Sequence, residues 1–203
     1  PSYLKYLAAQ PPTFVFEYVR DQFKYLQWQG LADPEKPWLM KSPLYQGLEL
    51  EILKVFPHAP FVMPHRSPLK AVASSCMTTR TFHWPFSHTT DINYPMLFEF
   101  LSITMDQHLA NCAAHPDLPM LDLSFEEVTT SSATAVEKIY AHAGMPLTDA
   151  VRHRVAQWER DHPMHPHGAP NYHLEDFSLS EDIVRTRMAN YVAFQMRQFG
   201  KLP

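Results

Sequence analysis

Glycine is scarce in this chain, which has five glycines against nineteen prolines in 203 residues. No two of them lie close together in the sequence: they are Gly30, Gly47, Gly144, Gly168 and Gly200. A glycine-rich loop that cradles a phosphate needs glycines close together, because the backbone must turn tightly and approach the ligand. The chain therefore contains no loop of that kind.

Disulfides and an excess of basic charge are also missing. Cys76 and Cys112 are too few for a disulfide framework, so we expect free thiols in a reducing, cytoplasmic compartment. The 17 basic side chains are outnumbered by 21 acidic ones, which argues against nucleic-acid binding by the whole surface. No apolar run approaches the roughly 20 residues needed to span a bilayer. We expect neither a nucleic-acid partner nor a membrane span.

The rest of the composition is that of a globular protein. Apolar residues make up 45% of the chain and charged residues 19%, which is a more apolar composition than that of disordered chains. The length suffices for one α/β domain over residues 1–203. The chain opens on Pro1 without a charged-then-apolar leader, so we expect a processed or truncated chain.

Apolar spacing and proline positions predict alternating elements in the first half. Two Ser-Pro pairs, Ser42-Pro43 and Ser67-Pro68, read as an N-cap followed by the first helical residue. The expected elements are a helix over 11–29, a short buried strand over 37–42, a helix from Ser42-Pro43 to Pro57 with Leu44, Leu48, Ile52 and Val55 buried, a strand around 61–63, and a helix from Ser67-Pro68. This strand–helix–strand–helix order favours a parallel sheet with crossover helices.

The second half is predicted to be rich in helices. After an irregular aromatic segment over 82–94, we expect a helix over 95–113, a strand over 121–125, and helices over 131–143, 149–160 and 181–199. Ser178 and Glu181 have the spacing of a capping box for the last of them. Residues 161–177 form a long loop, and loops of this length are often functional.

The junction over residues 65–75, HRSPLKAVASS, is the first candidate site. Arg66 follows a strand, at the edge where open α/β sheets bind ligands, and a helix then begins at Pro68. The start of a helix offers free N–H groups and a positive dipole end to an anion. Arg66 and Ser74 can converge there on a phosphate. The alternative is a surface arginine beside a helix-facing serine.

Two weaker candidates lie elsewhere. Lys41 stands near the end of the first predicted strand as a second cation that could face an anion, or as an ordinary solvated lysine. His162, His165 and His167 form an H-x-x-H-x-H pattern, but the spacing fits no closed metal site and neither cysteine is near. We therefore expect no metal and a polar loop over a binding site.

Four collinear blocks resemble the sulfotransferases that use 3′-phosphoadenosine 5′-phosphosulfate (PAPS), especially the branch with a K-[ST]-P segment. The blocks, which cover roughly residues 12–200, are LMKSPLYQGLELEILKVFPHAPFVMPHRSPLKAVASSC, LDLSFEEV, EKIYAHAGMPL and HPHGAPNYHLEDFSL. The resemblance implies part of a P-loop NTPase-like sulfotransferase fold, with a parallel sheet flanked by helices. It also implies that the strand and P-x-[ST]-G-[ST]-T loop that bind the 5′-phosphosulfate lie upstream of this chain.

The resemblance also implies the nucleotide-binding residues. Arg66 and Ser74 match the pair that binds the 3′-phosphate. Phe125 stands where the family usually has a tyrosine against the adenine. His167 and Gly168 match the loop that closes over the 3′-phosphate, with histidine in place of its usual basic residue.

The catalytic positions depart from the family pattern. Lys41 matches the lysine near the transferring sulfonate. The histidines expected two or four residues later are replaced by Pro43 and Tyr45, and a tyrosine with a pKa of about 10 is a poor general base. His88 and His65 are other candidate bases.

The resemblance implies sulfonate transfer from PAPS to a hydroxyl or amine of a small-molecule acceptor. We expect the chain alone to be a poor catalyst. The alternative is a non-catalytic relative that keeps only nucleotide binding; a kinase of related topology is weaker, because no Walker-type lysine motif is present. The aromatic residues over 82–100 suit the binding of an apolar or aromatic acceptor, but ordinary packing explains them equally well. They could also form a homodimer interface or contact the N-terminal part of the fold.

Overall fold

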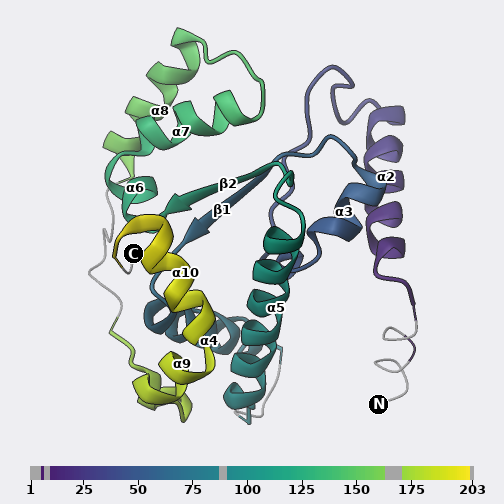
Figure 1. The fold of residues 1–203 in the computed structure, drawn as a ribbon. Helices are drawn as coiled ribbons and strands as arrows, with labels where there is room; N and C mark the ends of the chain where they lie inside the picture. The colour runs from purple at the N-terminus through teal and green to yellow at the C-terminus, as the bar shows by residue number, and fades with distance from the viewer. Residues whose placement is uncertain (1–5, 7–9, 87–90, 163–170, 202–203) are drawn as a thin grey trace. The chain divides into compact units, whose positions relative to one another are not determined.

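The computed structural model describes residue 6 and residues 10–86, 91–162 and 171–201. The chain divides into two compact units, one over residues 1–59 with 107–117 and the other over residues 60–106 with 118–203. We describe each unit separately (Figure 1). The single domain expected over residues 1–203 stays a prediction.

The first unit is helical. It holds α2 (Thr13–Trp28), the 3₁₀ helix η1 (Pro43–Tyr45), α3 (Glu49–Val55) and the last turns of α5 (Tyr94–Ala114). Phe16 of α2 and Ile52 of α3 are both buried. The helix predicted over 11–29 is confirmed, and Gly30 follows it with φ +71°, a conformation that glycine adopts readily.

The strand predicted over residues 37–42 is wrong. This segment has no regular secondary structure and pairs with no strand among the described residues, and Leu39 is 94% exposed. Trp38 stacks on Phe23 of α2, with ring centroids 4.1 Å apart. Because a strand is held by hydrogen bonds to a neighbour, an apolar segment that finds none within the described residues stays irregular.

The helix predicted from Ser42 onward is only partly confirmed. Ser42 Oγ accepts a hydrogen bond from the Leu44 N–H at 3.1 Å, so the start signal is correct. The helix is a single 3₁₀ turn, however, because Gly47 takes a left-handed φ of +82°, and α3 begins only at Glu49. Leu44 is exposed instead of buried.

The second unit contains a two-stranded parallel sheet. Strand β1 (Phe61–His65) pairs with β2 (Met120–Ser124), and the chain crosses between them through α4 (Pro68–His83) and α5. The register places Phe61 opposite Met120, and Figure 1 shows the two arrows side by side. The parallel sheet is confirmed, and Val72 and Cys76 of α4 are buried.

The end of β2 falls one residue earlier than predicted. Ser124 Oγ accepts a hydrogen bond from the Glu127 N–H at 3.0 Å and caps a helix, so Phe125 is helical. The elements that follow are α6 (Phe125–Thr130), α7 (Ser132–His142), α8 (Asp149–Asp161), η2 (Leu174–Phe177), α9 (Glu181–Arg187) and α10 (Ala189–Phe199). The helices predicted over 131–143 and 149–160 are confirmed.

The single helix predicted over 181–199 is two helices, α9 and α10, separated at Met188. The capping box at Ser178 is also wrong. Ser178 ends η2 with φ +57°, and Ser180 Oγ accepts from the Ile183 N–H at 3.4 Å to cap α9. Among the residues described, no helix combines the length and apolar character needed to cross a membrane.

Candidate functional site

The carboxyl end of β1 leads directly into the start of α4. Arg66 follows the strand, Ser67 occupies the N-cap position and Pro68 is the first residue of the helix. The Ser67 side chain makes no capping hydrogen bond. The backbone N–H groups of the first turn therefore remain available to an anion, at the positive end of a 16-residue helix.

The Arg66 guanidinium lies against an aromatic ring. Its Cζ is 4.7 Å from the centroid of the Phe125 ring, a cation–π distance. Its Nε is buried and, among the described residues, has no hydrogen-bond partner. A buried donor without an acceptor is costly, so this nitrogen is suited to a ligand oxygen.

Arg187 shows what a satisfied arginine looks like in the same unit. Its guanidinium donates to the Glu99 carboxylate at 3.0 Å and to the Asp106 carboxylate at 2.7 Å. In the part of the chain that the structure describes, Arg66 has no such carboxylate. Its positive charge is therefore not neutralised by a neighbouring side chain.

Ser74 lies further along α4, about 9 Å from Pro68 at the usual helical rise. It is half-buried and lines a cavity of about 260 Å³. The cavity is also lined by Met77, Thr78, Thr81, Phe82 and Tyr172. Ser74 thus offers a hydroxyl to a hollow on the same helix that begins beside Arg66; their convergence on one phosphate stays a prediction.

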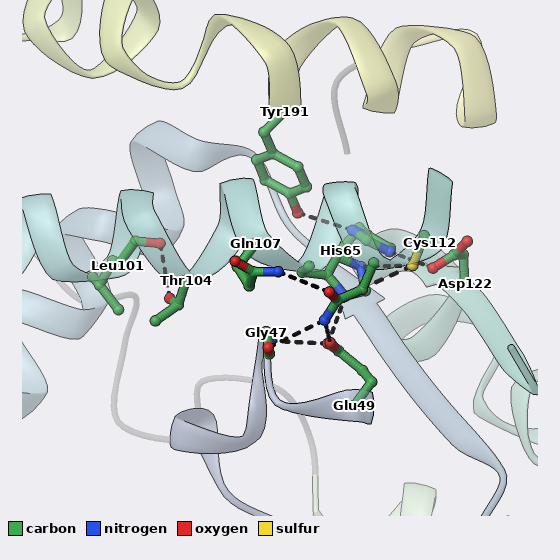
Figure 2. A network of polar contacts seen from close by, with 11 residues as sticks. Gly47, Glu49, His65, Leu101, Thr104, Gln107, Cys112, Asp122 and Tyr191 are labelled. Carbon is green, nitrogen blue, oxygen red and sulfur yellow. Dashed lines mark hydrogen bonds and ion pairs between the residues drawn. The ribbon is translucent and has the colours of Figure 1, made fainter. Parts of the chain in front are cut away.

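A buried chain of hydrogen bonds stands next to Arg66 (Figure 2). The Tyr191 hydroxyl lies 3.0 Å from His65 Nδ1, and His65 Nε2 lies 2.8 Å from Asp122 Oδ1. Burial raises the pKa of the Tyr191 hydroxyl, and the nearby Asp122 charge adds to the shift, so the hydroxyl stays neutral. His65 is completely buried with both ring nitrogens engaged, and its role as the base stays a prediction.

Gln195 connects the last helix to the junction. Its Nε2 donates to the Arg66 carbonyl oxygen at 2.9 Å, and the side chain is fully buried. Sequence reasoning missed Gln195 and Tyr191, which lie on the helical face of α10 that also carries apolar residues. A polar residue within an otherwise apolar stripe was the available signal.

A second buried network belongs to the first unit (Figure 2). Glu49, only 3% exposed, accepts hydrogen bonds from the Gly47 N–H at 2.9 Å, His108 Nδ1 at 2.8 Å and Asn111 Nδ2 at 2.7 Å. Asn111 also donates to the Gly47 carbonyl oxygen at 3.1 Å. Burial by itself raises the pKa of the Glu49 carboxyl, but these hydrogen bonds outweigh it and hold the pKa below its usual value.

The predicted catalytic residues belong to this first unit. Lys41 is exposed, and Tyr45 is half-buried, with its ring centroid 5.7 Å from that of Phe16 in an edge-to-face arrangement. Arg66, Ser74 and Phe125 belong to the second unit. The structure brings Arg66 and Phe125 into contact, whereas the proximity of Lys41 and Tyr45 to them stays a prediction.

Several predicted residues lie outside the described part of the chain. His167 and Gly168 fall in residues 163–170, and His88 falls in residues 87–90. His162 is described, and its ring stacks on Trp158 with centroids 4.8 Å apart.

Both cysteines are free thiols, as predicted. Burial raises the pKa of the Cys76 thiol to about 11, so it stays protonated and unreactive.

Comparisons with known proteins agree with this architecture. A profile of the sulfotransferase family matches residues 3–149. The crystal structure of sulfotransferase STF9 from Mycobacterium avium superposes with a TM-score of 0.78 at 23% sequence identity, covering 92% of this chain. This chain spans 47% of that protein's length. No curated protein matches the chain. The fold is thus the helix-rich, P-loop-like α/β fold of the sulfotransferases, and the chain belongs to the sulfotransferase family.

Proposed function

We propose that this protein transfers a sulfonate group from PAPS to a hydroxyl or amine of a small-molecule acceptor. The β1–α4 junction binds the 3′-phosphate of the donor. The observation that carries this proposal is the Arg66 guanidinium, whose Nε is buried without a partner in the described residues, beside the uncapped start of a long helix.

The nucleotide contacts follow from the chemistry of the junction. Arg66 provides a planar fork of N–H donors, Ser74 a hydroxyl donor and the first turn of α4 backbone N–H groups; all three suit a phosphate dianion. The Phe125 ring, already against the guanidinium, is assigned to the adenine. We assign closure over the phosphate to the loop that holds His167 and Gly168.

The transfer itself needs positioning and charge stabilisation. Bound PAPS supplies the sulfonate, which passes to the acceptor oxygen or nitrogen as its bond to the bridging phosphate oxygen breaks. Lys41, whose side chain is exposed, is assigned to the charge that develops on that bridging oxygen. Tyr45 is assigned to the acceptor as a hydrogen-bonding group, and a base takes the proton that the acceptor loses.

The acceptor is proposed to be apolar or aromatic. A cavity of about 610 Å³ lies at the far end of α4, a volume suited to a small organic molecule. It is lined by Arg80, Thr81, His83, Trp84, Ile92, Tyr94 and Asp176. Thr81 also lines the smaller cavity that holds Ser74, so the two hollows adjoin along one helix.

Trp84→Ala is expected to weaken binding of the probe 2-naphthol about tenfold, because the indole supplies a stacking surface in the larger cavity. Trp158→Ala, on α8 and outside the cavity, is the matched control and leaves binding unchanged. Ligand-detected NMR titration measures both. Equal affinities for the parent and Trp84→Ala would remove this cavity from the acceptor site.

Ser74→Ala is expected to weaken the binding of adenosine 3′,5′-bisphosphate about fivefold to tenfold, which corresponds to the loss of one hydrogen bond to a charged oxygen. Adenosine 5′-phosphate, which lacks the 3′-phosphate, is expected to bind the variant and the parent alike. Ser75→Ala is the control, since Ser75 is equally half-buried but does not line the cavity. A loss shared by both nucleotides would contradict the assignment of Ser74.

Isothermal titration calorimetry with the unmodified chain tests the proposed function. We expect adenosine 3′,5′-bisphosphate to bind more than about 100-fold more tightly than adenosine 5′-phosphate, and the difference to shrink as salt is raised. Equal affinities for the two nucleotides would show that the chain has no 3′-phosphate site.

A further inference from the structure

Tyr191 and Gln195 lie one turn apart on α10, so their side chains share one face of the helix. Both are buried, at 4% and 0% exposed. The Tyr191 hydroxyl lies 3.0 Å from His65 Nδ1, and Gln195 Nε2 donates to the Arg66 carbonyl oxygen at 2.9 Å. This face of α10 therefore contacts two consecutive residues at the carboxyl end of β1.

Asp122 extends the contact to the neighbouring strand. It lies opposite Met63 in the sheet register, and its Oδ1 is 2.8 Å from His65 Nε2. A carboxylate only accepts, so we assign the hydrogen to Nε2 of His65, and Nδ1 then accepts from the Tyr191 hydroxyl. Every member of the chain from Tyr191 to Asp122 thus has a defined donor and acceptor role.

These contacts fix both the backbone and the side chain of Arg66. Its carbonyl oxygen is bonded to a fully buried amide, and its guanidinium rests on the Phe125 ring. An arginine fixed at both ends loses its rotamer freedom when the protein folds instead of when the ligand binds. Fixing Arg66 in this way therefore increases the affinity for the group that the guanidinium binds.

We propose that Gln195 and the Tyr191–His65–Asp122 chain are positioning residues for Arg66, through which α10 sets how strongly the junction prefers a nucleotide with a 3′-phosphate. This inference rests on the proposed function. Residues 189–199 lie outside the 3–149 range matched by the family profile, so that match assigns no role to them.

The test compares two conservative variants in the full chain. Gln195→Met keeps the volume of the side chain, removes the donor to Arg66, and also removes Oε1, which is buried without a partner among the described residues. Tyr191→Phe removes one oxygen atom and keeps the ring. Gln198→Met, at an exposed position of α10, is the control.

Calorimetry with adenosine 3′,5′-bisphosphate and adenosine 5′-phosphate gives the readout. We expect about tenfold weaker bisphosphate binding in Gln195→Met and about threefold in Tyr191→Phe, with adenosine 5′-phosphate changed by less than about twofold. In an Arg66→Ala background, Gln195→Met is expected to have no further effect, because it acts through Arg66.

Four results would overturn the inference. Unchanged bisphosphate affinity in both variants, while Arg66→Ala loses it, leaves the proposed function intact and removes the role of α10. Equal weakening of both nucleotides, or a full additional loss in the Arg66→Ala background, shows a general structural effect instead of positioning. If the parent does not distinguish the two nucleotides, the proposed function fails and the inference fails with it.

Discussion

Arg66→Ala is expected to weaken adenosine 3′,5′-bisphosphate binding about 100-fold and to leave adenosine 5′-phosphate within about twofold of the parent. The guanidinium is the strongest group at the junction, since it brings a charge and several donors, and its Nε is buried without a partner in the described part of the chain. Removing it eliminates charge-assisted hydrogen bonds to the 3′-phosphate and leaves other nucleotide contacts in place.

Two further variants separate geometry from charge. Arg66→Lys keeps the positive charge but loses the planar fork and most of the stacking on Phe125, so we expect an intermediate loss of about tenfold. Arg154→Ala, at an exposed position of α8, removes the same charge elsewhere and is expected to bind as the parent does. Tight bisphosphate binding by Arg66→Ala would show that Arg66 is not the phosphate ligand.

Glu49→Ala is expected to lower the free energy of unfolding by about 3–5 kcal/mol, because it leaves buried donors of His108 and Asn111 and the Gly47 N–H without their acceptor. Glu17→Ala, on the exposed face of α2, is the control and is expected to change stability by less than about 0.5 kcal/mol. Urea unfolding followed by circular dichroism measures both. A loss as small as that of the control would contradict the account of this network.

The same network predicts a direction for the pH dependence of stability. The folded pKa of Glu49 lies below its usual 4.5, so the unfolded chain binds the proton more readily. The stabilisation is complete above about pH 4.5 and is lost as the pH falls through the folded pKa. The free energy of unfolding of the parent should therefore approach that of Glu49→Ala as the pH falls. Urea titrations of both proteins at pH 6 and at pH 4 and below measure this.

Local signals in the sequence predicted the elements that are held locally. The helices α2, α4, α7 and α8 have clear apolar spacing or capping residues, and the structure confirms them. The predictions of secondary structure failed where contacts with residues distant in the sequence determine the local structure. Residues 37–42 are apolar enough for a strand but pair with none of the described strands, and a left-handed Gly47 divides the helix expected after Ser42.

The candidate site likewise contains residues that the sequence predicts and residues that only the structure reveals. Arg66 and Ser74 could be proposed from sequence because a strand end, a helix start and an eight-residue spacing lie within one short segment. The residues that support Arg66 come from far along the chain, since Tyr191 is 126 positions from His65 and Gln195 is 129 positions from Arg66. No local pattern connects residues so far apart, and only the folded chain shows them in contact.

A crystal structure of the chain with adenosine 3′,5′-bisphosphate tests the central claim most directly. We expect the 3′-phosphate between the Arg66 guanidinium and the Ser74 hydroxyl, with its oxygens within hydrogen-bonding distance, about 2.7–3.1 Å, of both groups. A nucleotide bound with its 3′-phosphate in solvent or against other residues, and with Arg66 unengaged, would contradict the account.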